Sequence, residues 1–457
     1  MTHTTAIAPA PLLRLAPGIR REGTAGETLR LGPLRLSDPG PALRAAVTAL
    51  SDWTRPETLF EVAVRTGGPE TGLALRRLLD RCAGAGLLEE AATVGERIGL
   101  AIRVWPGTGL GPAIGDTTAA PPYRLIPHFD LRPDPGGWRA ASPLAPGEAV
   151  ITDPSLLATL GAARTGWPPA SDEERLAARL LLKAGLLAAQ TTDQPRSGLD
   201  GPALWLHTRS RRGLAKGPVG VLGADPAAPS ALRDPGGTGA PLPLPQPGAT
   251  SWPAFDTVLD RRASRRPSDA DARMTAADLN ALLWTAARNT DGPFRRGAEA
   301  ERLRRPWPAA GGRHESDIFV ALSPGFDPLP RFSLYDHANH ALRPLAADPA
   351  PLLADAATAM GSDAPPQALL ILSARYERLT GRYGAASYAL MLKTAGAALQ
   401  TLHLTATALG VASCILGGGN SRLFADLTGL DPLTDGAIGE IALTGRFGPS
   451  PTETRHA

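Results

Sequence analysis

The chain has 457 residues, a net charge of +3, 50 glycines, 46 prolines and few aromatic residues. A chain of this length is longer than one that folds around a single hydrophobic core, so we expect two or three domains. The weak charge, without a long basic run, argues against nucleic-acid binding, and two distant cysteines argue against a disulfide framework. No signal peptide or membrane-spanning segment is evident at the start, so we expect a protein of the reducing cytoplasm.

Short strands and three helices are expected within residues 1–100. Apolar and polar residues alternate over 29–36, which predicts a hairpin. Helical spacing follows over 41–50 and 70–83, and between them Thr54 is expected to cap a helix that has proline in its first turn. This order is typical of a small winged-helix module.

Residues 101–195 repeat the pattern loosely. Strands are expected at 123–127 and 148–151, and helices are expected to begin after Asp153 and Ser171. The last helix begins with three acidic residues, which would repel phosphate, whereas a DNA-reading helix presents basic and amide side chains. We therefore interpret both modules as sites for docking an extended peptide.

A connector rich in proline and glycine follows over 196–255, and a larger domain is expected over 256–457. Helices and strands alternate in this domain, which predicts an α+β fold. After Arg382 and Tyr383 the chain runs to about Leu409 as a segment that is apolar on every side, so we expect a central buried helix.

Arg262, Ser264 and Arg266 form the first candidate site. Successive side chains of an extended chain point in opposite directions, so these three would share one face. Two guanidinium groups beside a hydroxyl suit a phosphate monoester, although a solvated basic turn has the same composition. Arg446, directly after the last expected strand, could supply another cation or could simply be solvated.

Two glycine-rich turns form the second candidate site. Ala310 and Gly311 precede a buried strand, and Gly417 and Gly418 follow the central helix. Small residues let backbone amides approach a flat ligand closely, while ordinary flexible turns remain the alternative.

Taken together, the order of these motifs resembles the flavin-dependent nitroreductase superfamily, and in particular its SagB/McbC-type azoline dehydrogenases of ribosomal peptide biosynthesis. The motifs are Arg-x-Ser-x-Arg, Pro-Ala-Ala-Gly-Gly, Arg-Tyr-Gly, Gly-Gly-Gly and a final Gly-Arg, and the resemblance covers about residues 200–457. The segment Leu206–Gly213 also looks like one that precedes the oxidase domain in longer members. The cyanobactin and thiopeptide oxidases are similar in carrying N-terminal winged-helix peptide-clamp domains.

The resemblance implies FMN, with its phosphate held by Arg262, Ser264, Arg266 and Arg446. Backbone at Ala310, Gly311, Gly417 and Gly418 would border the isoalloxazine ring. It also implies a homodimer with flavin sites at the subunit interface and a precursor peptide as substrate. Whether cyclodehydratase partner proteins are required stays open at this stage. The implied reaction is the two-electron oxidation of a thiazoline or oxazoline to a thiazole or oxazole.

The catalytic pair departs from the family pattern. Where the family has Lys-Tyr, this chain has Arg382-Tyr383, and arginine cannot act as a base. We therefore expect Tyr383 to serve as base or proton relay, with Arg382 favouring its charged form and orienting the substrate.

Three alternatives remain open at this stage. The same fold could oxidise a carrier-bound or small-molecule substrate. The chain could be a peptide-binding scaffold without flavin, or a winged-helix regulator with a flavin sensor. The Arg262, Ser264 and Arg266 set argues against loss of flavin, and peptide-docking modules argue against a free small substrate.

Overall fold

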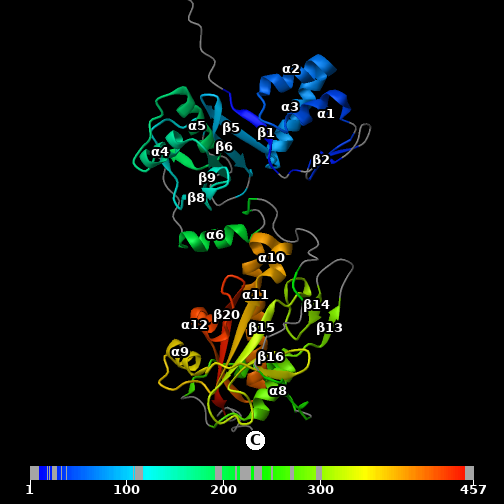
Figure 1. The fold of residues 1–457 in the computed structure, drawn as a ribbon, viewed down its shortest axis with the longest axis vertical. Coiled ribbons are helices and arrows are strands. Elements are labelled where there is room, and N and C mark those ends of the chain that lie inside the picture. The colour runs from blue at the N-terminus through cyan, green and yellow to red at the C-terminus, as the bar shows by residue number, and fades with distance from the viewer. Residues whose placement is uncertain are drawn as a thin grey trace, which may run out of the picture. The chain divides into compact units, whose positions relative to one another are not determined.

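The computed structural model describes residues 10–17, 19, 21–22, 28–31, 33–37, 39–106, 108, 117–190, 198–211, 214–216, 228–230, 239–248, 251–267, 272–294 and 301–447. The chain divides into two compact units, Met1–Val219 and Gly220–Ala457 (Figure 1).

The N-terminal unit contains a six-stranded antiparallel sheet with strand order β1-β5-β6-β10-β9-β8. Its first elements are β1 (Leu12–Leu15), β2 (Arg21–Glu22), β3 (Leu29–Leu31), β4 (Leu34–Leu36), α1 (Gly40–Ala49), α2 (Pro56–Gly67), α3 (Pro69–Gly84), β5 (Leu88–Val94) and β6 (Arg97–Val104). They are followed by β7 (Tyr123–Leu125), β8 (Asp130–Asp134), β9 (Gly137–Ala141), β10 (Gly147–Ile151), α4 (Pro154–Ala162), α5 (Asp172–Lys183), β11 (Leu187–Ala189) and α6 (Gly201–Arg209).

Most elements expected in this unit are present. The hairpin over 29–36 is confirmed by the pairing of β3 with β4. Strand β6 pairs with both β5 and β10, so the boundary expected at residue 100 falls inside a strand that joins the two modules in one sheet. Their assignment as winged helices stays a prediction. The segment expected to precede the oxidase domain begins inside α6 and ends at 212–213, outside the described residues.

The helix cap predicted at Thr54 is wrong. The Thr54 hydroxyl donates instead to the carbonyl of Ala49 at 3.0 Å, and its main chain pairs with Leu13 of β1. Helix α2 therefore begins at Pro56 without a side-chain cap. Long-range strand pairing outweighed a local capping signal here.

The C-terminal unit is built on a seven-stranded antiparallel sheet with strand order β12-β17-β16-β15-β18-β20-β19. Its elements are β12 (Leu242–Pro243), α7 (Phe255–Arg261), α8 (Ala276–Ala287), β13 (Asp291–Phe294), β14 (Arg302–Arg304), the 3-10 turn η2 (Ala310–Gly312), β15 (Ser316–Leu322), β16 (Phe332–Asp336), β17 (Ala341–Pro344), α9 (Ala350–Met360), β18 (Ala368–Arg375), α10 (Glu377–Tyr383), the 3-10 turn η3 (Gly384–Ala386), α11 (Ser387–Ala408), β19 (Val411–Ile415), α12 (Ser421–Thr428) and β20 (Asp435–Arg446).

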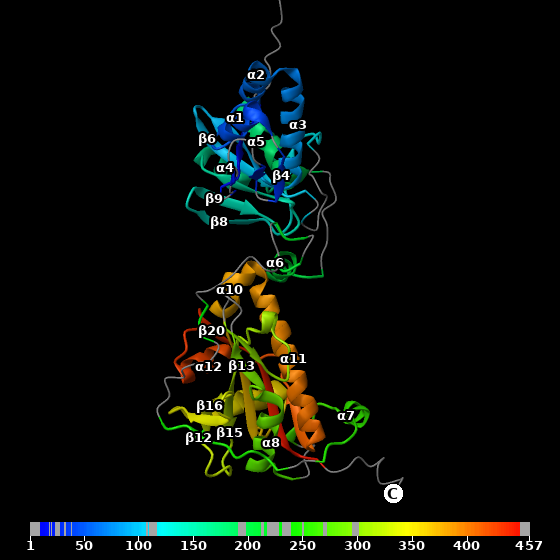
Figure 2. The ribbon, with the colours of Figure 1, turned by 90° about the vertical axis from the view of Figure 1, so that its right-hand side faces the viewer.

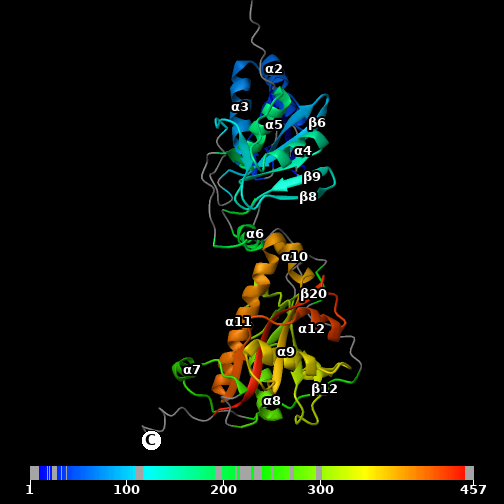
Figure 3. The same cartoon turned by 90° about the vertical axis from the view of Figure 1, so that its left-hand side faces the viewer.

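Helices cover both faces of this sheet. Helix α11 lies along one face, while α9 and α12 cover the other (Figures 2 and 3). Strand β15 shows the consequence: every second residue from Ile318 packs toward α8 and α11, and Phe319 and Ala321 pack toward α9. The apolar runs predicted as buried strands are thus buried on both faces.

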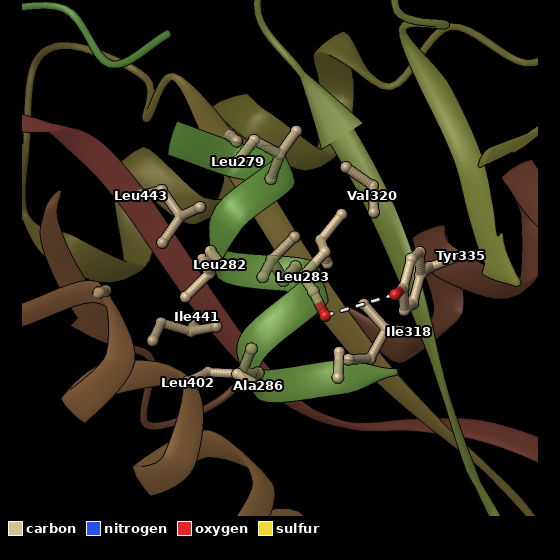
Figure 4. Close-up of a cluster of buried hydrophobic side chains, with 14 of the residues drawn as sticks. Leu279, Leu282, Leu283, Ala286, Ile318, Val320, Tyr335, Leu402, Ile441 and Leu443 are labelled. Carbon is tan, nitrogen blue, oxygen red and sulfur yellow. Dashed lines mark hydrogen bonds between the residues drawn. The ribbon is translucent and has the colours of Figure 1, made fainter. Parts of the chain in front are cut away.

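The larger core cluster is drawn in Figure 4. Leucines of α8 interdigitate with Ile318 and Val320 of β15 and with Ile441 and Leu443 of β20. At its edge the Tyr335 hydroxyl donates to the carbonyl of Leu283 at 3.3 Å, so this buried tyrosine has a partner for its polar atom.

The prediction that the central helix is buried on every side is wrong for a single chain. Tyr388, Leu392, Gly396 and Gln400 of α11 are all exposed, four residues apart, and therefore form one stripe along the helix. Tyr388 and Leu392 keep 46% and 39% of their surface accessible. The helix is apolar all round in sequence, yet one chain covers only part of its circumference.

We expect Leu282→Ala in α8 to lower the free energy of unfolding of the C-terminal unit by about 3 kcal/mol, because Leu282 is fully buried and the substitution leaves a cavity. Leu433→Ala is the matched control, since Leu433 is 84% exposed. Urea denaturation followed by circular dichroism measures both. Equal losses in the two variants would contradict this core.

Candidate functional site

The Arg262–Arg266 segment is extended and fastened to one end of the sheet. The amide of Arg265 donates to the Ser413 carbonyl at 2.9 Å, and the Thr444 hydroxyl donates to the Arg265 carbonyl at 3.1 Å. The side chains of Arg262, Ser264 and Arg266 are exposed. The Arg266 Nε also donates to the carbonyl of Met360 at 2.7 Å, so its position is fixed by the end of α9.

Arg446 lies at the same end of the sheet. It is the last residue of β20 and pairs with Val411 of β19, two residues from the Ser413 that holds the segment above. Its guanidinium forms an ion pair with Asp278 of α8. An anion at this place would share Arg446 with that carboxylate.

The glycine turn lies farther along β19. Gly417 and Gly418 are exposed, and a Cβ atom added at either would meet nothing within 4 Å. Gly419 differs, because a Cβ there would collide with the carboxyl group of Glu440. The turn is therefore open toward solvent on one side and closely backed by a buried carboxyl on the other.

Tyr383 and Gly311 meet at the start of α11. Tyr383 is 8% exposed and ends α10, and its hydroxyl oxygen lies 2.6 Å from the place that a Cβ of Gly311 would occupy. Gly311 has φ +60°, which also favours glycine. The Arg382 guanidinium lies 6.0 Å from the Tyr383 ring centroid. Two motifs that are 72 residues apart in the sequence thus form one contact.

The predicted residues nevertheless fall into separate groups in one chain. His403 of α11 contacts the carbonyl of Ala263 at 3.2 Å, whereas Gly311 and Tyr383 lie where α11 begins, at Ser387. Sixteen residues of helix separate Ser387 from His403, roughly 24 Å at 1.5 Å per residue. The phosphate-type residues and the Tyr383 contact therefore lie toward opposite ends of α11.

Sequence reasoning missed a buried polar cluster behind Gly311. It contains Arg305, Arg313, His314, Glu315, Asp317, His337, Arg375 and Arg378, each at most 8% exposed. Burial lowers the pKa of both His314 and His337 to about 3, helped by the charge of Arg305, so both imidazoles are neutral. The signal was available in Arg313-His314-Glu315-Ser316-Asp317, a run of charged and polar residues directly before the apolar residues 318–322.

The chemistry of these residues fits FMN. Guanidinium groups and a hydroxyl are the donors that a phosphate monoester prefers. The open Gly417–Gly418 backbone and Gly311 present main chain without side chains, which suits close approach of a flat ring. One chain supplies the cationic segment and the Gly311 backbone at separated places along α11.

Comparison with known proteins agrees with this fold. A model described as the nitroreductase family matches residues 259–445. The C-terminal unit carries a nitroreductase-family domain. The expected α+β class with a C-terminal nitroreductase-like domain, preceded by an N-terminal domain, is thereby confirmed.

Solved structures resemble the nitroreductase-family domain at low identity. A candidate nitroreductase from Ralstonia eutropha JMP134 is 23% identical, with a TM-score of 0.36, covering 51% of this chain and 99% of that one. A candidate nitroreductase from Anabaena variabilis is 22% identical, with a TM-score of 0.33, covering 46% and 43%. The E. coli microcin synthetase McbBCD complex with truncated pro-MccB17 bound contains a chain that is 19% identical, with a TM-score of 0.34, covering 45% and 77%.

No curated protein matches the chain. Within the described residues, none of the helices combines the length and the apolar character needed to cross a bilayer.

Glu440 gives this site a testable pH dependence. Burial raises the pKa of Glu440 from 4.5 to about 7, and Asp355 of α9 adds to the effect. The folded state therefore holds this proton more tightly than the unfolded state does, and stability falls as pH rises from 4.5 through 7.

We expect Glu440→Gln to stabilise the protein at pH 8, by up to about 3 kcal/mol, because it removes the cost of ionising a buried carboxyl. The gain should shrink strongly at pH 5. Thermal unfolding at both pH values measures it, with the exposed Glu377→Gln as control. A gain that is independent of pH would contradict the buried titration.

Proposed function

We propose that this protein is an FMN-dependent dehydrogenase of the SagB/McbC type, which oxidises thiazoline or oxazoline rings in a ribosomally made precursor peptide. The observation that carries the proposal is the contact between Tyr383 and Gly311. It joins the residue proposed to move the proton to the backbone proposed to border the flavin ring. The nitroreductase-family match over 259–445 supports the flavin chemistry.

The chain's own residues would position and deprotonate the ring. FMN, when bound here, would supply the acceptor for the two electrons that leave the ring, with molecular oxygen as the final oxidant. Tyr383 is the base or proton relay that receives the α-proton of the azoline. Arg382 orients the peptide, since a guanidinium donates to carbonyl oxygens but does not accept protons. Aromatisation favours the products, so holding ring, base and acceptor in line is the main task.

Arg262, Ser264, Arg266 and Arg446 are the residues we propose for the FMN phosphate. All four lie at the 411/446 end of the sheet, and the main chain of Ala263 and Arg265, the residues that alternate with the first three, is held by β19, β20 and α11. Gly417 and Gly418, with Ala310 and Gly311, would border the isoalloxazine.

The N-terminal unit is proposed to dock the precursor peptide. Its sheet carries a hollow of about 310 Å³ with basic and acidic side chains interleaved across neighbouring strands. Arg14 pairs with Glu89 at 2.7 Å, and Arg139 pairs with Glu148 at 2.6 Å. A hollow that offers both charged and apolar side chains on the face of a sheet could take an extended peptide, whose backbone and side chains present both kinds of group. Cyclodehydratase proteins would act on the same peptide before this step.

A second copy of the chain is proposed to complete the flavin site. The exposed stripe on α11 and the exposed Phe255 and Leu259 of the adjacent α7 leave apolar surface that a partner would cover. Such a homodimer would bring Gly311 of one copy toward the phosphate-type residues of the other. Cys82 and Cys414 are both free and buried, which fits the reducing cytoplasm.

The first test is the visible absorption spectrum of the purified protein, before and after heat release of any ligand. Flavin bands and free FMN in the supernatant are expected. A colourless protein that also fails to take up added FMN would overturn the proposal and favour a peptide-binding scaffold. Flavin with no turnover of a thiazoline peptide would favour an oxidase for another substrate.

We expect Tyr383→Phe to lower kcat on a thiazoline-containing peptide by about 100-fold or more while FMN stays bound, because the phenolic oxygen that handles the proton is removed. Tyr376→Phe is the matched control, since it removes the same hydroxyl from a half-buried tyrosine of the same unit that lies outside the proposed site and outside the α11 stripe. Steady-state formation of the thiazole, followed by mass spectrometry, measures both. Full turnover by Tyr383→Phe would remove this residue from the mechanism.

We expect Leu392→Asp on the α11 stripe to convert a dimer to a monomer and to weaken FMN binding, because it places a charge in the proposed interface. Leu433→Asp introduces the same charge at a residue that is 84% exposed on another part of the unit. Light scattering after gel filtration and FMN fluorescence titration measure the two effects. A wild-type monomer that binds FMN fully would contradict the shared site.

A further inference from the structure

Arg378 is a fully buried arginine near the start of α10. Its Nε donates to the carbonyl of Arg313 at 3.1 Å, and one Nη donates to the carbonyl of Glu301 at 2.8 Å. The other Nη donates to the carbonyl of Pro229. One guanidinium thus joins α10 to three other segments of the C-terminal unit, through their main chains.

Arg313 returns the interaction. Its Nη1 donates to the carbonyl of Arg378 at 2.7 Å, and its side chain is 2% exposed. Each arginine therefore binds the main chain of the other, and this reciprocal pair fixes α10 against the residues that follow Gly311. We call Arg378 and Arg313 together the arginine clamp.

The arginine clamp and the Tyr383 contact join the same two segments. Gly311 lies two residues before Arg313, and Tyr383 lies five residues after Arg378 in the same short helix. The Tyr383 hydroxyl lies 2.6 Å from the Cβ position of Gly311, so a small rotation of α10 would change this contact directly. The clamp holds α10 at its first turn, and the tyrosine stands at its last residue.

The clamp is a costly way to hold two segments together. Burial lowers the pKa of Arg378 to about 10, and the neighbouring charges of Arg375 and Arg313 add to this effect. A buried charge commonly gives little net stability compared with an apolar replacement of the same volume. The planar guanidinium instead fixes the geometry of the contact, because its N–H donors point at fixed angles.

We propose that the arginine clamp positions Tyr383 over Gly311, and that Arg378 is a positioning residue for the oxidation. This inference rests on the proposed function, since it assigns the clamp to the geometry between the proton acceptor and the backbone that borders the flavin. Arg378 is fully buried, so we assign it a role through Tyr383 and not through direct contact with the substrate.

The test uses the full-length, FMN-loaded protein and a synthetic peptide with one thiazoline. Arg378→Lys keeps the charge but loses the fork that reaches several carbonyls. We expect kcat to fall by about 10- to 100-fold, the range that a misplacement of about 1 Å produces, with KM changed by less than about threefold. Unchanged kcat in a folded Arg378→Lys protein would overturn the proposal.

Arg375→Lys is the matched control. Arg375 is also buried, but it binds the carboxylate of Asp317, at 3.2 Å, and the carbonyl of Ser230, at 2.7 Å. We expect kcat to stay within about threefold of wild type. An equal loss in both variants would mean that any buried arginine of the cluster matters, and the specific role of Arg378 would be lost.

Gly311→Ala changes the same contact at its other partner. It provides a second test of the contact if Arg378→Lys does not fold. The added methyl group collides with the Tyr383 hydroxyl, so the same loss in kcat at nearly constant KM is expected. Combining the two substitutions should cost less than the product of the single effects, because both act on one contact. Full multiplicativity would contradict a shared role.

Amide hydrogen exchange separates this inference from the proposed function. In Arg378→Lys the amides of 310–314 and 379–386 should exchange faster together, and in Arg375→Lys they should not. If the wild type oxidises no thiazoline, the proposed function fails, and this joint change still supports the clamp. Unchanged exchange in both segments would overturn it.

Discussion

The pairing of β15 with β18 is the constraint on which the C-terminal unit depends. Both strands are buried on both faces, and their register places Ser316 opposite Ala374. Gly311 lies just before one strand and Tyr383 lies just after the other, so the register of the sheet decides whether they meet. A slip of one residue would turn every apolar side chain to the opposite face. Core packing and the geometry of the candidate site are therefore enforced by the same hydrogen-bond ladder.

Helix α11 spans the distance between the two parts of the candidate site. Its C-terminal half adjoins the cationic segment Arg262–Arg266, and its N-terminal end adjoins Tyr383. The exposed stripe of Tyr388, Leu392, Gly396 and Gln400 runs along the helix between these ends. A flavin shared between two copies would explain both the separation and the stripe, because the same helix would then lie in the interface. The arginine clamp would supply rigidity at the end where protons are proposed to move.

Much of the C-terminal fold could be predicted from the sequence, since strands such as 318–322 are continuous apolar runs and the Thr275 capping box forms as its residues suggest. The order of five short motifs indicated the nitroreductase-family domain. The surroundings of α11 could not be predicted, because an apolar helix looks the same whether its own chain or a second copy covers it. The helix cap predicted at Thr54 does not form, because the main chain of Thr54 pairs with Leu13, 41 residues earlier in the sequence. The arginine clamp was invisible because its bonds go to main-chain carbonyls, which leave no trace in residue types.

Among the glycines that the structure describes in this unit, several lie against the polar end of a large side chain, for example Gly311 against Tyr383, Gly419 against Glu440 and Gly436 against Tyr376. In each case a methyl group would occupy the space of that polar atom, so neither position can change freely while the other keeps its residue. Such positions should covary among relatives, with a larger residue at the glycine accompanied by a shorter partner. A relative that keeps both residues of a pair would keep this local packing. These six positions could therefore be used to sort diverged sequences into those that share the arrangement and those that do not.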